Sequence, residues 1–319
     1  MSKIKKINSA KIILPSIVLF FTVILLLSLP VLLNYNSIQN VIEKKVSSEF
    51  KVSLKIFSDI SLKIFPKPHY LIKKGNLDLN IENDKSSIIQ TDNLKIFIPL
   101  KKIYSKSNLE IESIEVENVN IYYTLDDFLD FRKHLYYKIN KPIYIKKSKL
   151  FLIDKNDKTI LISPIKKIEY LINKNQNSKE LKVKGNIFDI NYNSFWSRSY
   201  DDPNNSITKI KLKNPNLSIK NLFTYKNILN FSGKSSISFL NEDIFINYLV
   251  KESKIFIHSP NINKNQKIKL NSKIELDPFF FDATIDVDNK DINFIIDNLL
   301  FMILNSNDYL GNINGNLTL

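Results

Sequence analysis

VSLKIFSDISLKI, residues 52–64, alternates apolar and polar side chains along most of its length. Leu54 and Ile56, then Ile60 and Leu62, occupy every second position. Successive side chains of a β-strand point to opposite faces, so this period of two predicts strands with one apolar and one solvated face. The same alternation returns in short segments down to residue 319, divided by Gly, Pro, Asn and Asp. The chain is therefore predicted to be mainly β, arranged as an antiparallel meander.

Strand patterning continues through the C-terminal two thirds of the chain. Breaker residues between the segments favour short connections, as in a meander. The segments predicted as strands there are 149–153, 159–162, 181–190, 208–212, 217–219, 235–240, 244–250, 255–258, 268–276, 284–287 and the tail LGNINGNLTL at 310–319.

Three segments have the period of a helix instead. Residues 38–50 place apolar side chains at helical spacing. Residues 125–139 follow Thr124, which with Asp127 forms a capping-box-like start. Residues 292–304 are too short to span a membrane, and we expect them to form a buried or groove-capping amphipathic helix.

One uncharged segment, residues 12–33, is long enough to cross a bilayer. At about 1.5 Å per residue it gives roughly 33 Å of helix. Lys3, Lys5, Lys6 and Lys11 precede it, and the positive-inside rule keeps such a terminus in the cytoplasm. The sequence predicts a single-pass protein of the bacterial inner membrane with a periplasmic body. A cleaved signal peptide is the alternative, but its apolar region is usually shorter.

Each apolar strand face must be buried against a second layer. Two sheets can pack as a sandwich, or one curved sheet can leave an elongated apolar groove. A groove in a membrane-tethered protein suits acyl chains, because its apolar strip replaces water. Under that hypothesis, the groove is lined by Leu62, Ile64, Leu77, Leu79, Ile81, Leu94, Ile96 and Ile98.

An anchor, a short helix and then paired strands follow one another in this chain. A strand ends in Phe65-Pro66, a later strand carries Ile111, Ile114 and Val116, and Asp154 follows the next strand. This order and these positions resemble the N-terminal region of the AsmA-like family of bacterial envelope proteins. The resemblance implies a repeating β-groove body, kinship with bridge-like lipid-transfer proteins, and a role in phospholipid traffic between the two membranes, without catalytic residues.

This organisation divides the chain into four expected regions. A basic cytoplasmic tail occupies 1–11 and the membrane helix 12–33. An AsmA-like β-rich region covers 34–175 and includes the helix near 125–139. Further groove repeats occupy 176–319, where the chain stops inside a strand pattern, as expected of a fragment or of an unusually short member.

Composition argues against most other chemistry. The formal charge of +14 comes almost wholly from Lys, with Arg only at 132 and 198, so no nucleic-acid partner is expected. The chain has no cysteine, so it lacks disulfides and thiolate sites. Asp126, Asp130 and His134 share one predicted helix face, but a solvated charged face is commoner than a metal site there. We expect no enzyme, no cofactor and no metal.

Two functional hypotheses follow. The first is a lipid-binding or lipid-transporting envelope protein, whose partners are phospholipid, the inner membrane and other envelope or outer-membrane proteins. The second is a structural assembly factor for outer-membrane proteins, with a closed sandwich and no lipid. The aromatic cluster Tyr192, Phe195, Trp196 and Tyr200 suits core packing, a membrane interface or a groove mouth.

Overall fold

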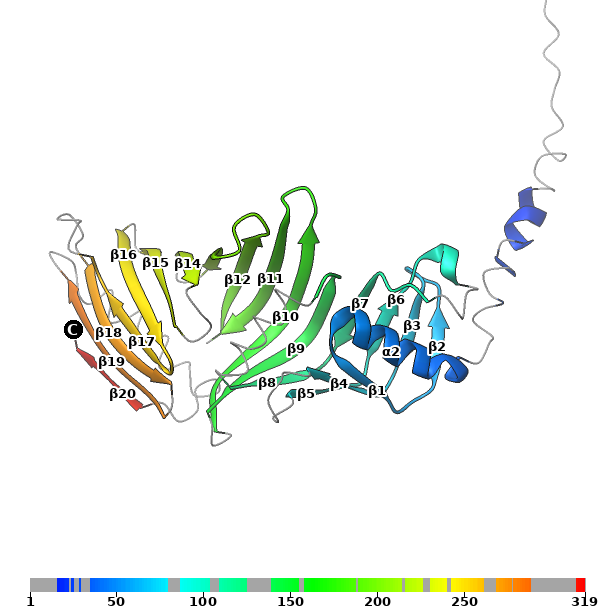
Figure 1. Cartoon of the computed structure of the whole chain (residues 1–319), viewed down its shortest axis with the longest axis horizontal. Coiled ribbons are helices and arrows are strands. Elements are labelled where there is room, and N and C mark those ends of the chain that lie inside the picture. The colour runs from blue at the N-terminus through cyan, green and yellow to red at the C-terminus, as the bar shows by residue number, and fades with distance from the viewer. Residues whose placement is uncertain are drawn as a thin grey trace, which may run out of the picture.

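One long, curved β-sheet dominates the computed structural model of this chain, and it confirms the mainly β prediction (Figure 1). Its strands lie side by side from the blue N-terminal end to the red C-terminal end. The structure describes residues 16–22, 24–25, 29, 35–79, 87–103, 109–124, 139–154, 158–187, 189–213, 216–225, 230–239, 242–260, 268–276, 278–287 and 314–318.

A short helical segment lies against the N-terminal end of the sheet. It consists of the 3-10 turn η2 (Asn36–Ile38) and helix α2 (Gln39–Phe50), which confirm the helix predicted at 38–50. Ile42, Val46 and Phe50 stand four residues apart and are buried, because such positions share one face of a helix. The helix ends where Lys51 adopts the left-handed conformation and donates its N–H to the carbonyl of Ser47.

A small second sheet continues this covering layer. Its strands are β1 (Ser53–Ile56), β4 (Gly75–Leu79) and β5 (Ser87–Thr91), with β4 antiparallel to both neighbours. Leu54 and Ile56 of β1 are buried in the same core as the apolar face of α2. The helix and the small sheet together form what we call the cover.

The main sheet begins beneath the cover with β2 (Ile60–Lys63), β3 (His69–Ile72) and β6 (Leu94–Phe97), followed in the chain by the 3-10 turn η3 (Leu100–Lys102). Two short strands, β7 (Ser113–Glu117) and β8 (Asn120–Tyr123), then pair parallel with successive parts of β9 (Ile143–Ile153). Asn118, between them, has a positive φ of 58°. The prediction of a purely antiparallel meander was therefore wrong at this point.

An ion-pair network fixes this parallel junction. Glu115 of β7 is 3.0 Å from Lys95 Nζ of β6 and 2.6 Å from Lys146 Nζ of β9. Burial alone would raise the pKa of Glu115, but its hydrogen bonds and charge interactions with the two lysines hold that pKa below its ordinary value. The three strands are thus joined by side chains as well as by the backbone.

From β9 onward each strand is antiparallel to the next as far as β19. The last described strand, β20, is parallel to β19. Among the described pairings none joins β2 to β20, so the sheet is curved and open (Figure 1). These strands are β10 (Thr159–Asn173), β11 (Ser178–Ile187), β12 (Ile190–Ser199), β13 (Asn205–Leu212), β14 (Leu217–Tyr225), β15 (Asn230–Phe239), β16 (Glu242–Lys251), β17 (Lys254–His258), β18 (Ile268–Leu276), β19 (Phe279–Val287) and β20 (Asn314–Thr318).

Several boundaries differ from the sequence prediction. The single strand expected at 181–190 is the end of β11, a turn through Asp189 with a φ of 58°, and the start of β12. Strands β3, β5 and β12 were not predicted, and β10 is far longer than 159–162. The proposed boundary at residue 175 falls in the turn between β10 and β11, where strand pairing continues without a break.

Several other predictions fall wholly or mostly on residues that the structure leaves undescribed. These are the helices at 125–139 and 292–304 and the possible metal ligands Asp126, Asp130 and His134. Of the expected membrane segment, residues 16–22 are helical and positions 24, 25 and 29 are also described. In the described part of the chain no helix has the length and hydropathy needed to cross a membrane.

The cover should depend on Phe50, whose side chain is fully buried at the end of α2. We expect Phe50→Ala to lower the free energy of unfolding of the purified full chain by about 3 kcal/mol or more, because it leaves a cavity in the core. Urea unfolding followed by circular dichroism measures this change. Val41→Ala in the same helix, where Val41 is 38% exposed, should change it by less than about 0.5 kcal/mol. Equal effects of the two substitutions would contradict the packing of α2.

Candidate functional site

The strand register assembles a single apolar face across most of the sheet. Residues directly opposite each other in paired strands point to the same side. We call this side the inner face, because it is the side that the cover packs against. One unbroken row on it joins Ile60, Ile72, Leu94, Val116, Ile145, Ile168, Val183, Ser194, Ile210, Ile219, Ile237 and Ile244.

Ser194 is the only polar member of this inner row. Burial changes along it: Ile72 and Leu94, beneath the cover, have no exposed surface, whereas Ile168, Val183 and the following members as far as Ile237 are half-buried. The apolar strip thus extends well beyond the part of the sheet that the cover encloses.

An apolar cavity of about 240 Å³ lies where the cover ends. Val52, between α2 and β1, and Leu77 of β4 contribute the cover side of its wall, and strands β7 to β12 contribute the other. Polar atoms are scarce in this wall: the hydroxyls of Tyr123, Tyr170, Tyr192 and Ser194 are its polar side-chain groups. The residues on the sheet side include Ile114, Ile143, Ile145, Ile165, Ile168, Leu181 and Val183.

The residues predicted to line a groove lie mainly in the closed core. Leu62, Leu94, Ile96 and Ile98 are at most 1% exposed, and all belong to the cluster beneath α2. Leu77 alone of the predicted set lines the cavity. Ile64 is half-buried just after β2, the side chain of Leu79 is not described, and Ile81 lies outside the described residues. The half-buried apolar strip runs over later strands.

Sequence reasoning missed the residues of this strip for an identifiable reason. Ile168, Val183 and Ile210 do alternate with polar residues, and that signal was present in the sequence. It cannot show which apolar face receives a cover and which does not, because α2 packs on strands that are distant from it in the chain.

Two tyrosines shape the inner face by lying over glycines. Tyr192 is directly opposite Gly185, and Tyr248 is directly opposite Gly233. A Cβ added at Gly233 would be 2.0 Å from the Tyr248 hydroxyl oxygen, and one at Gly185 would be 2.8 Å from that of Tyr192. The absence of a side chain is therefore what allows each ring to lie across the neighbouring strand, as in the aromatic rescue of strand glycines.

Each tyrosine hydroxyl contacts a polar group on the strand beyond the one that carries the glycine. The Tyr192 hydroxyl is 3.1 Å from the Ser163 hydroxyl, and Tyr248 donates to Asn221 Oδ1 at 2.8 Å. Burial raises the pKa of Tyr192, so the phenol stays neutral. Each ring thus bridges three strands.

Two buried cations mark the end of the inner face on β11 and β12. Lys179 and Arg198 are directly opposite each other and are 1% and 6% exposed. Each is two residues from an inner-face side chain of its own strand, Leu181 for Lys179 and Trp196 for Arg198, so both cations lie on the inner face. Burial is the larger cause and the charge of Arg198 the smaller one, and together they lower the pKa of Lys179 to about 8.

The loop between β12 and β13 packs on these cations. Arg198 Nη2 donates to the carbonyl of Pro203, and Lys179 Nζ lies 5.5 Å from the centre of the Tyr200 ring. Trp196 Nε1 is also buried, with no hydrogen-bond acceptor among the residues that the structure describes. Of the aromatic cluster noted in the sequence, Trp196 points to the inner face and Phe195 to the opposite one.

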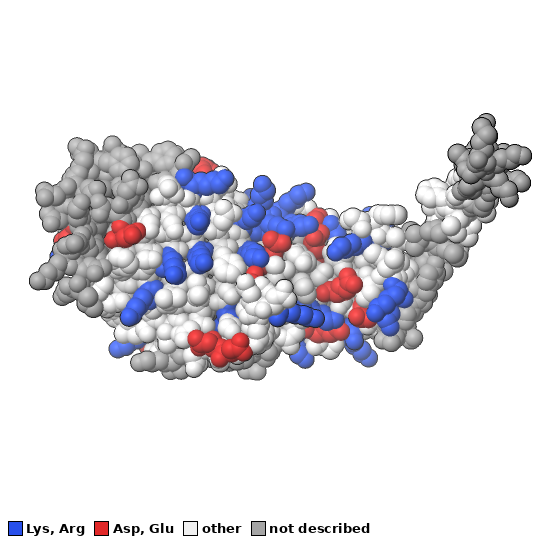
Figure 2. All heavy atoms as spheres, turned by 90° about the horizontal axis from the view of Figure 1, so that it is seen from above, with Lys and Arg blue, Asp and Glu red and all other residues white. Residues whose placement is uncertain are grey.

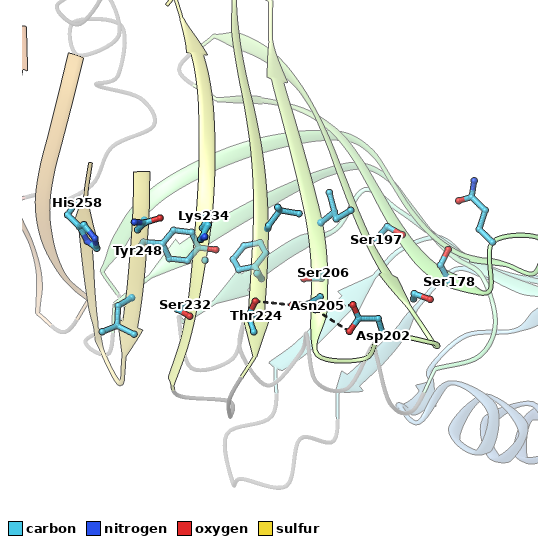
Figure 3. A pocket seen from close by; sticks show the side chains of 18 residues that line it. Ser178, Ser197, Asp202, Asn205, Ser206, Thr224, Ser232, Lys234, Tyr248 and His258 are labelled. Atoms are coloured by element: carbon cyan, nitrogen blue, oxygen red, sulfur yellow. Dashed lines mark hydrogen bonds between the residues drawn. The ribbon is translucent and has the colours of Figure 1, made fainter. Parts of the chain in front are cut away.

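A wider hollow of about 820 Å³ lies on the opposite, outer face (Figure 3). The register places Ser197, Ile207, Leu222, Lys234, Asn247 and His258 in one row there, and the hollow follows this row.

The polar groups at one end of the hollow bind one another. Asn205 donates to Asp202 and accepts a hydrogen bond from Thr224 (Figure 3).

Figure 2 shows basic side chains spread over separate positions of the molecule, with acidic ones among them. Of the two concavities, the smaller one is continuous with the apolar row, and we regard it as the candidate functional site.

No protein-family model, curated protein or solved structure matches this chain. In the described residues no group of three His, Asp or Glu side chains could hold a metal ion.

Gly233→Ala should disturb the inner face directly. The added Cβ would clash with the Tyr248 ring and would lie 2.6 Å from the carbonyl oxygen of Leu222. We expect a loss of about 1 to 3 kcal/mol in the free energy of unfolding, since overpacking forces side chains and backbone to shift. Ser232→Ala, next to it in β15 but pointing outward, is the control and should have little effect. A stable Gly233→Ala variant with an unchanged near-ultraviolet circular dichroism spectrum would contradict the ring placement.

Lys179→Met should stabilise the protein at pH 7, by about 1 to 2 kcal/mol, because it removes a buried charge next to another cation. The folded-state pKa of about 8 is below the ordinary 10.5, so the fold disfavours the protonated amine. This penalty is fully present below pH 8 and disappears as the pH rises toward 10.5. Urea unfolding at pH 7 and pH 10 should therefore show the difference between wild type and variant shrinking at the higher pH. A constant difference would contradict the lowered pKa.

Proposed function

We propose that this chain is a non-enzymatic lipid-binding protein of the bacterial envelope, which holds phospholipid acyl chains on its inner face and serves phospholipid transport. The observation that supports this proposal is the inner row, which is apolar from β2 to β16 except at Ser194 and is half-buried from Ile168 to Ile237. Apolar surface of this extent on a single sheet layer suits an apolar ligand, because each acyl carbon removed from water contributes favourably.

The position of the cavity supports this assignment. An acyl chain entering at the edge of the cover would meet Leu77, Ile168 and Val183, and would then continue along the half-buried members of the inner row. The outer face of the same strands carries Lys182, Lys184, Lys209, Lys211 and Lys220, together with the exposed Ile207 and Leu222. These lysines solvate that part of the outer face, whereas the inner row is apolar apart from Ser194.

The N-terminal segment supports a membrane anchor. Ile17, Val18, Leu19, Phe20 and Phe21 lie in the helical residues 16–22, and their side chains are 46% to 66% exposed. Contiguous exposed apolar side chains of this kind mark a membrane or protein contact. With the lysines before residue 12, the proposal places the N-terminus in the cytoplasm and the sheet in the periplasm.

Kinship with AsmA-like envelope proteins is part of the same proposal. It is supported by the order of apolar segment, short helix and paired strands, together with an open curved sheet. Periplasmic or outer-membrane proteins would then receive the lipid at the β20 end of the sheet.

Photo-crosslinking in growing cells tests the lipid path. Benzoylphenylalanine would replace Val183 or Ile257 on the inner face, and Lys184 or Phe256 on the outer face of the same strands. We expect phospholipid adducts at the two inner positions only, detected by radiolabelled phosphate on the full chain. Adducts at all four positions, or at none, would overturn the proposal.

A charge placed in the path should interrupt it. Val183→Glu puts a carboxylate in the apolar cavity wall, and we expect it to reduce lipid adducts at Ile257 by at least about tenfold, because burying an unpaired charge is costly. Lys184→Glu is the matched control on the outer face and should leave the adducts unchanged. Urea unfolding of both variants checks that each remains folded. Undiminished adducts in a folded Val183→Glu protein would show that lipid does not pass this point.

A further inference from the structure

Three side chains with hydrogen-bond donors occupy neighbouring positions at one end of the inner face. Lys179 and Arg198 are directly opposite each other, and Trp196 precedes Arg198 by two residues and therefore shares its face. The indole Nε1 is buried with no acceptor among the described residues. The register therefore places an ammonium, a guanidinium and a neutral N–H on neighbouring positions of the same face.

The chemistry of these groups favours an anion. Two like charges close together in a low-dielectric site repel each other, and an anion between them turns that repulsion into attraction. The lowered pKa of Lys179 is a sign of this unfavourable setting. Arginine is also the better residue for a phosphate, because its planar fork offers paired donors. In a chain that otherwise uses Lys almost everywhere, one of only two arginines is buried here.

We propose that Lys179, Arg198 and Trp196 bind the phosphate group of a phospholipid whose acyl chains lie on the inner face. This inference rests on the proposed function. Leu181, which lines the apolar cavity, is two residues from Lys179 on the same strand, or about 7 Å along it. A phosphate held by the cations therefore leaves the attached acyl chains at the apolar wall.

The loop from Tyr200 to Pro203 marks where the phosphate oxygens bind. The Pro203 carbonyl accepts a hydrogen bond from Arg198 Nη2. In the lipid-bound protein that we propose, a phosphate oxygen takes the place of this carbonyl oxygen. The Tyr200 ring, 41% exposed, lies beside Lys179 and forms the solvent side of the site. The headgroup beyond the phosphate thus faces water while the acyl chains face the cavity.

Binding of two tail-labelled lipids to the detergent-purified full chain tests this site. The probes are a fluorescent phosphatidylglycerol and a diacylglycerol with the same labelled acyl chain, which differ in the phosphate headgroup. We expect the wild type to prefer phosphatidylglycerol by at least about tenfold, as charge-assisted hydrogen bonds would give. The variant K179M/R198M should bind both lipids equally. The control K184M/K209M removes the same charge from the outer face and should keep the wild-type preference.

The outcomes separate this inference from the proposed function. Failure of the wild type to bind either lipid would overturn the proposed function itself. Binding of both lipids with no preference, or a preference that survives in K179M/R198M, would overturn only the phosphate site. A rise in Tm with glycerol 3-phosphate at concentrations as low as those needed for phosphatidylglycerol would assign the site to free phosphate esters instead. Loss of stability in K179M/R198M without a change in lipid preference would show that the cations are structural.

Discussion

The structure depends on one constraint: the apolar row on the inner face of the sheet extends beyond the layer that covers it. Because strands have a period of two, the inner row places an apolar side chain on strand after strand, from Ile60 on β2 to Ile244 on β16. Helix α2 and the small sheet enclose only the first strands, where Ile72 and Leu94 are fully buried. A compact core at one end and a half-buried strip along the rest both follow from this mismatch.

The junction between these two regions is also where the chain departs from a simple meander. Strands β7 and β8 run parallel to β9, and Glu115 joins β6, β7 and β9 through ion pairs on the outer face. On the inner face of the same strands the packing is incomplete and leaves the apolar cavity beside Leu77. The rigid pairing on one face and the unfilled space on the other make this region the natural start of an apolar path.

The half-buried apolar strip beyond the junction also carries aromatic and charged side chains at particular positions. Tyr192 and Tyr248 lie over Gly185 and Gly233, so the sheet carries flat aromatic surface where two side chains would otherwise compete for space. Lys179 and Arg198 place positive charge at the edge of the same face. The larger hollow, lined by hydroxyl and amide groups that partly satisfy one another and by apolar side chains such as Ile207 and Leu222, is on the other side of the sheet. Continuity of the apolar row, and not volume, distinguishes the two concavities.

The sequence by itself determined the mainly β fold, the helix at 38–50 and the apolar identity of one face, because period and composition are local properties of each segment. It did not determine where that face is covered, so Leu62, Leu94 and Ile96 were expected in a groove and lie in a closed core. Nor could it show that Lys179 and Arg198 are neighbours, since a strand pattern does not reveal the turn at Asp189 that pairs β11 with β12. These features depend on register and on packing between distant segments, which only the tertiary structure decides.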